Sequence, residues 1–307
     1  MPRAIILYEI DESFGPNILA EYYLKQDDKI PQIILKEFAE KHDLKQLLDV
    51  TIHKDENRYF SKKMNAEPIE KDNLYLSFIL KEEEDLVSLR SIFENVDEKI
   101  IQNFSSDKNK LTQLLKDVSN SILSLMQKLQ EPKIIKETIN ERTKNMLDEG
   151  NLSEARELID LGEDIPEKLA EEVKLAEDFL NEALYRKAKK SFLKAAEFAK
   201  QIQEDEIASF LENKGNQVGL FPDYLKEREN LYKEIEKLMS SLRVNDISFY
   251  DNFIEPLDRL IEISLIFEDH DVMNILNQIK NKVQKASRLA NELNEIDEDM
   301  KLLIKKI

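Results

Sequence analysis

The chain has no cysteine, and only five of its 307 residues are glycine. Without cysteine there is no disulfide, no thiolate metal ligand, and no prenyl or palmitoyl anchor. Few glycines leave little room for phosphate-binding loops, and the sequence contains no Walker motif, no GxGxxG and no GxSxG. We therefore expect neither a nucleotide-binding loop nor a hydrolase nucleophile elbow.

Candidate metal ligands and catalytic bases are also scarce. The histidines are His42, His53 and His270, and no two have the spacing of metal ligands. The densest carboxylate run, Glu82 to Asp85, precedes a predicted helix start, where negative charge is favourable without any calcium or catalytic role. We expect no cofactor, no metal and no catalytic residue, and so a protein that is not an enzyme.

Long apolar runs are missing as well. No stretch approaches the roughly 18 to 20 uncharged apolar residues that span a bilayer. Residues 1–3 lead directly into a strand-like segment instead of a signal peptide, so we expect a cytoplasmic protein that reaches membranes only through a partner. The net charge of −18 disfavours nucleic acid and anionic lipid as ligands.

Five strand-like segments lie in the first 80 residues. Residues 4–10 and 74–80 carry apolar side chains on both alternating faces, so we expect them mid-sheet, covered on both sides. Residues 18–24 form a further strand-like segment, and residues 48–53 and 58–64 are more polar. A long turn-forming loop joins the first segment to 18–24, and a polar run joins 48–53 to 58–64, which predicts two antiparallel hairpins.

Helical spacing of apolar residues appears between and after these strands. Ile34, Leu35 and Phe38 predict one short helix. Two longer stripes begin after Asp85 and after Asp107, where an aspartate can cap a helix N-terminus. The resulting order over residues 1–130 is β-β-α-β-β-β-α-α.

This order resembles the longin domain, in which a five-stranded antiparallel sheet carries one helix on one face and two on the other. The resemblance rests on element order and burial pattern, and it implies an α+β domain at residues 1–130. The related roadblock fold opens with a helix, whereas here a strand begins within a few residues of Met1.

The turn Phe14-Gly15-Pro16 resembles the one that archaeal longin-like proteins carry between their first two strands. The alternative is that Gly15 and Pro16 simply make the loop possible.

From Pro132 onward the periodicity is entirely helical. Small and aromatic residues take the spacings of a tetratricopeptide repeat at Ala176, Phe179, Tyr185, Ala188, Phe192 and Ala195, and again at Met146, Leu152, Ala155, Ile159 and Gly162. This resemblance implies stacked helical hairpins over residues 133–219; an irregular helical domain is the alternative. We expect helices to end or break at Gly150, Gly162, Pro166, Gly215, Gly219 and Pro222.

Residues 220–307 predict a helical bundle or coiled coil. The last helix carries apolar residues in steps of three and four from Leu276 to Leu303. Packing within the chain and a seam offered to a partner both explain this stripe, and the exposed apolar length decides between them.

Longin domains are protein-binding modules of membrane traffic, and small GTPases and other longin domains are frequent partners. The resemblance implies a cytosolic adaptor or regulator that binds a small GTPase, a longin or roadblock subunit, or both. It also implies docking near Ile33, Phe38 and Ile52, for which core packing is the alternative. The competing function is a structural assembly or tethering protein that forms a homodimer through an edge strand or the C-terminal helix.

Overall fold

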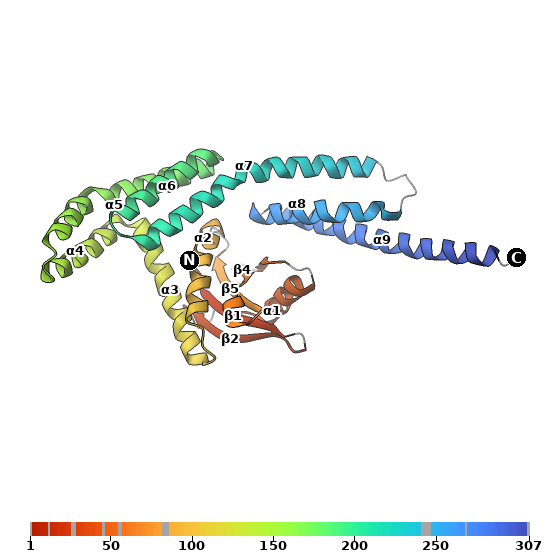
Figure 1. Ribbon diagram of the computed structural model, residues 1–307, viewed down its shortest axis with the longest axis horizontal. Helices are drawn as coiled ribbons and strands as arrows, with labels where there is room; N and C mark the ends of the chain where they lie inside the picture. Colours follow the sequence, from red (N-terminus) through yellow and green to blue (C-terminus); the bar gives the residue numbers. More distant parts are fainter. Residues whose placement is uncertain are drawn as a thin grey trace. The chain divides into compact units, whose positions relative to one another are not determined.

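The computed structural model describes residues 2–11, 13–25, 29–44, 47–54, 57–81, 86–240, 247–267 and 269–305 (Figure 1). The chain divides into two compact units, Met1–Gly219 and Leu220–Ile307. The boundary falls inside the helix Asp205–Ser240. The acidic run Glu82 to Asp85, with its predicted cap, lies outside the described residues.

The first unit begins with the five predicted strands. They are β1 (Ala4–Asp11), β2 (Gly15–Tyr23), β3 (Asp49–Lys54), β4 (Asn57–Lys63) and β5 (Leu74–Lys81), in the spatial order β2-β1-β5-β4-β3 with every pairing antiparallel. The prediction of one antiparallel sheet with the first and last strands inside it is confirmed. The first loop is shorter than predicted, because Asp11 pairs with Gly15 and extends the ladder.

Apolar side chains cover both faces of the sheet, and helices cover them in turn. On one face, Ile6 and Tyr8 pack with Phe38 from α1 (Gln32–Ala39), which a π-helical turn, Glu40–Leu44, follows. On the other face, Ile5 and Phe78 pack with α2 (Leu86–Gln102) and α3 (Lys108–Gln130). Each face therefore has its own hydrophobic cluster.

The helical part of the first unit follows α3 and shares one hydrophobic core with it. Its helices are α4 (Pro132–Asp148), α5 (Leu152–Asn181), α6 (Tyr185–Gln201) and the first part of α7 (Asp205–Ser240). Consecutive helices α4, α5 and α6 lie side by side (Figure 1). One hydrophobic cluster runs from the sheet face through α2 and α3 to α7.

The same turn ends α4, α5 and α6. Gly150, Ala183 and Gln203 have φ of 87°, 56° and 56°, the left-handed conformation of a helix C-terminal cap. At each of these helix ends, the amide of the residue after the left-handed one donates to the carbonyl five residues before it. Leu184 N, for example, donates to Phe179 O at 2.8 Å. The turns are thus Schellman-type caps, two of them without glycine.

Small residues follow each turn at constant offsets. Five positions after the left-handed residue stand Ala155, Ala188 and Ala208, all fully buried, and twelve positions after it stand Gly162, Ala195 and Gly215. A Cβ atom added at Gly162 would lie 2.9 Å from Ile139 Cγ2. The small side chains therefore let neighbouring helices approach closely.

The prediction of helix breaks is wrong at five of the six positions. Gly150 ends α4, but Gly162 and Pro166 lie inside α5, and Gly215, Gly219 and Pro222 lie inside α7. Gly162 and Gly215 face Ile139 and Phe192 in neighbouring helices, so close packing outweighs their low helix propensity.

The second unit contains the rest of α7, a 3-10 turn at Ile247–Phe253, α8 (Ile254–Ile266) and α9 (His270–Ile304). Its core joins Ile235 of α7 to Leu257 and Leu260 of α8 and Leu276 of α9. Pro256 lies in the first turn of α8, where a missing amide hydrogen costs no helical bond. Arg259 of α8 forms an ion pair with Glu227 of α7.

We predict that Ala183→Gly and Gln203→Gly each stabilise the protein, because a left-handed backbone is strained for residues with a Cβ atom. The expected gain is about 0.5–1 kcal/mol for each, measured by urea denaturation. Gly150→Ala is the matched opposite change and should destabilise by a similar amount. Equal losses of stability in all three variants would contradict left-handed helix caps at these three positions.

Candidate functional site

The turn between β1 and β2 holds an aromatic side chain in solvent. Phe14 is 90% exposed, while Asp11 Oδ1 accepts hydrogen bonds from the amides of Ser13 at 2.8 Å and Phe14 at 2.9 Å. Gly15 has φ of 80°, and Pro16 pairs with Ile10 as the strand begins. Gly15 and Pro16 thus shape the turn. The shape of the turn does not explain why position 14 carries an exposed phenylalanine.

A polar pocket of about 480 Å³ adjoins this turn. Its lining residues are Glu9, Ile10, Asp11, Ser13, Lys71, Asp72 and Asn73. Lys71 Nζ lies 2.8 Å from Glu9 Oε2, and this hydrogen bond lowers the pKa of Glu9. Carboxylates of Asp11 and Asp72 add negative charge to the wall. The combination of an apolar ring and an acidic hollow suits a partner that offers an apolar side chain near a basic one.

The other predicted docking residues do not come together as one surface. Ile33 is 60% exposed on α1, whereas Phe38 and Ile52 are buried in the cluster between α1 and the sheet. Phe38 and Ile52 therefore belong to the core between α1 and the sheet, which is the alternative to docking. Of these three residues, only Ile33 is available to a partner in this conformation.

A chain of buried polar groups lies beneath α1. Tyr8 OH is 2.8 Å from Ser61 Oγ, which is 2.9 Å from His42 Nε2, and His42 Nδ1 is 2.6 Å from Leu47 O. Because a carbonyl only accepts, His42 Nδ1–H donates to Leu47 O, Ser61 donates to Nε2, and Tyr8 donates to Ser61. One arrangement satisfies every group.

This polar chain lies inside the hydrophobic core, and its role there is structural. Ser61 and Tyr8 have no exposed surface, and the His42 ring lies 4.5 Å from that of Tyr75. Burial lowers the pKa of His42 to about 4 and raises that of Tyr8. The His42–Ser61 pair has the contact distance of a catalytic dyad, but its serine does not reach solvent. Sequence reasoning missed the pair because residues 42 and 61 are joined only by the fold.

The lowered pKa of His42 predicts a specific loss of stability in acid. Since the unfolded chain binds a proton near pH 6.5 and the folded chain only near pH 4, stability falls as the pH drops through this window, by up to about 3 kcal/mol. In His42→Gln, urea denaturation between pH 7 and 4 should show a shallower decline. His53→Gln, at an exposed strand position, is the control. Parallel curves for wild type and His42→Gln would contradict a buried neutral imidazole.

A second hollow, of about 340 Å³, lies between α2, α3 and α7. Its floor is apolar, with Ile92 and Val96 from α2, Ile122 from α3 and Phe210 from α7. Its rim is polar and includes Lys99, Asp205 and Glu206. The sequence predicts the apolar stripes of α2 and α3, but it does not predict the groove, because the groove exists only where these two helices meet α7.

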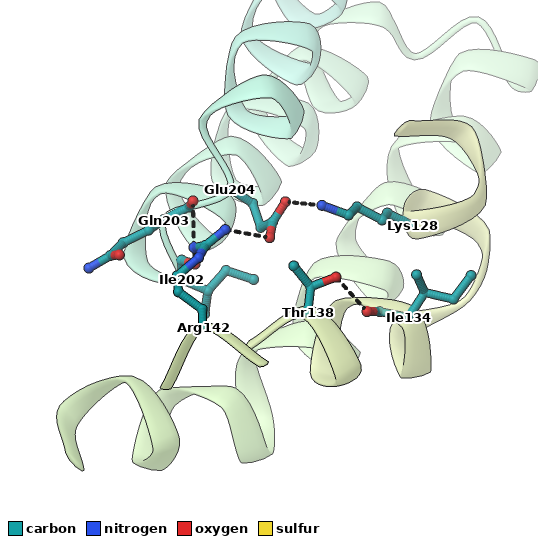
Figure 2. Close-up of polar contacts among 7 residues, drawn as sticks. All are labelled: Lys128, Ile134, Thr138, Arg142, Ile202, Gln203 and Glu204. Atoms are coloured by element: carbon teal, nitrogen blue, oxygen red, sulfur yellow. Dashed lines mark hydrogen bonds and ion pairs between the residues drawn. The ribbon is translucent and has the colours of Figure 1, made fainter. Parts of the chain in front are cut away.

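A buried carboxylate fastens the turn between α6 and α7. Figure 2 shows Glu204 between Lys128 of α3 and Arg142 of α4, with its oxygens 2.7 Å from Lys128 Nζ and 3.2 Å from Arg142 Nη2. Arg142 Nη1 also donates to the carbonyls of Ile202 and Gln203. The cluster therefore joins the last turn of the stack to the helix that covers the sheet.

We predict that Glu204→Ala destabilises the first unit by about 3 kcal/mol, because it leaves two partly buried cations without their carboxylate. Glu212→Ala is the control, since Glu212 and its partner Lys200 are both exposed, and it should change stability by less than about 1 kcal/mol. The measurement is urea denaturation monitored by circular dichroism. Equal effects would contradict a structural role for the cluster.

Comparison with known proteins gives no match to any family model, curated protein or solved structure. Among the described residues, no helix is both long and apolar enough to cross a bilayer. The same residues contain no group of three or more carboxylate, imidazole or thiol side chains that could hold a metal ion.

Proposed function

We propose that this chain is a non-enzymatic adaptor that binds a small GTPase, a longin or roadblock subunit, or both, in an assembly of the membrane-trafficking kind. Its N-terminal part would be a longin-like domain. The support is architectural: five antiparallel strands, with α1 packed on one face and α2 and α3 on the other. This is the arrangement that the longin resemblance implies.

The observation that carries the binding role is the exposed Phe14. Leaving a phenylalanine in water forgoes about 1.5–3 kcal/mol of burial free energy, so an exposed ring on a hydrogen-bonded turn is a surface that a partner can use. Aromatic residues are also common among the few residues that dominate interface energies. The Asp11 hydrogen bonds hold the turn before any partner arrives, which lowers the entropy lost on binding.

The helical part supports a second binding surface. The turns at Gly150, Ala183 and Gln203, with alanine five positions later, favour a tetratricopeptide-like stack over an irregular helical domain. Stacked hairpins commonly present extended binding faces. The apolar groove between α2, α3 and α7 is the part of this region that best suits a further protein. Two separate surfaces would make the chain an adaptor.

The proposal is tested by titrating the purified full chain with small GTPases from the same cell, loaded with GTP or GDP, and with longin or roadblock subunits. We expect one of them to bind, and Phe14→Ser to weaken that binding at least tenfold. Leu152→Ser is the control, because Leu152 is a comparably exposed apolar residue on α5. A nucleotide-dependent affinity would identify a GTPase as the partner.

Absence of binding to every such protein at 100 µM, a concentration roughly a hundredfold above a micromolar Kd, would contradict the adaptor function. Equal weakening by Phe14→Ser and Leu152→Ser would leave an adaptor but remove Phe14 from its interface.

A further inference from the structure

The last part of α9 carries an exposed apolar stripe. Leu289, Leu293, Ile296, Met300 and Leu303 are each between 53% and 61% exposed, and they follow one another in steps of four, three, four and three. This is the spacing of the a and d positions of a coiled coil. With Leu293 as position a, the earlier core positions include Ile275, Ile279, Lys282 and Ala286.

The stripe is separate from the face of α9 that packs on α8. That face includes Leu276, Lys280 and Ser287, and Lys280 forms an ion pair with Asp258 of α8. At 3.6 residues per turn, the stripe lies about 160° around the helix from it. Packing within the second unit therefore does not account for the stripe, and the exposed apolar length favours a seam offered to a partner.

Charge along α9 is divided into two blocks. Residues 282–288 hold Lys282, Lys285 and Arg288 and no acidic residue, whereas residues 292–299 hold five acidic residues and no basic one. Reversing the helix direction places the basic block of one copy opposite the acidic block of another. A self-complementary pattern of this kind fits a twofold-symmetric pair.

We propose that two copies of this chain associate through an antiparallel coiled coil of their α9 helices. Setting Leu293 opposite Leu289 of the second copy also sets Ala286 opposite Ile296 and Ile279 opposite Leu303. Met300 then faces Lys282, whose aliphatic stem can cover it while the ammonium reaches water. Every layer of the seam thus has apolar contact.

Flanking charges select the antiparallel direction. In this register Lys285 of each copy lies beside Asp299 of the other, giving two attractive pairs, and Glu292 meets its own equivalent once at the axis. In a parallel, in-register pair, Glu292 of each copy would instead lie beside Asp297 of the other, giving two repulsive pairs. This self-association is independent of the adaptor function proposed above.

Disulfide trapping tests the direction, because the chain has no cysteine of its own. A mixture of Ala286→Cys and Ile296→Cys full-length chains should oxidise to a mixed disulfide dimer. Ile296→Cys alone should not cross-link, since its two copies lie about 15 Å apart along the axis. Efficient cross-linking of Ile296→Cys alone would indicate a parallel pair and overturn the proposal.

Light scattering tests the association itself. Wild type at 100 µM should have twice the 36.0 kDa mass of one chain. Leu293→Glu should return it to one chain, while Asn291→Glu, on the opposite side of α9, should remain a dimer. Circular dichroism checks that both variants stay folded. A monomeric wild type at 100 µM, or a dimeric Leu293→Glu, would overturn the proposal and leave the seam to a different protein.

Discussion

The pairing of β1 with β5 places two strands with apolar side chains on both surfaces in the middle of the sheet. Neither surface can face water without exposing a row of large side chains, so helices must cover both. This constraint puts α1 on one side and α2 with α3 on the other. Because α3 leads directly into α4, it also sets where the helical stack begins.

The stack extends the same core outward from the sheet. Buried alanines and glycines bring α4 to α7 close together, and Glu204 joins the last turn back to α3 and α4. Two of the exposed apolar features carry the proposed interactions: the Phe14 ring on the β1–β2 turn and the stripe of α9. Each is on its own compact unit, which is consistent with separate roles in partner binding and self-association.

Short-range patterns predicted the strands and the first three helices, because alternation and helical spacing report burial directly. They failed where a tertiary contact decided the outcome. Gly162 and Pro166 look like helix breaks but lie inside α5, whereas Ala183 and Gln203, with no turn signal, end helices. The sequence leaves docking and core packing open for Phe38 and Ile52, and the packing of α1 on the sheet places both in the core. The His42–Ser61 contact joins distant segments and has no local signature.

The most direct test of the central constraint is native-state hydrogen exchange of the full chain. If the β1–β5 pair is the covered centre of the first unit, the amides of Ile5, Leu7, Leu76 and Phe78 should exchange most slowly there, through global unfolding of that unit. The edge strands β2 and β3 should exchange faster. Exchange of β1 and β5 as fast as these edges would contradict a sheet organised around that pair.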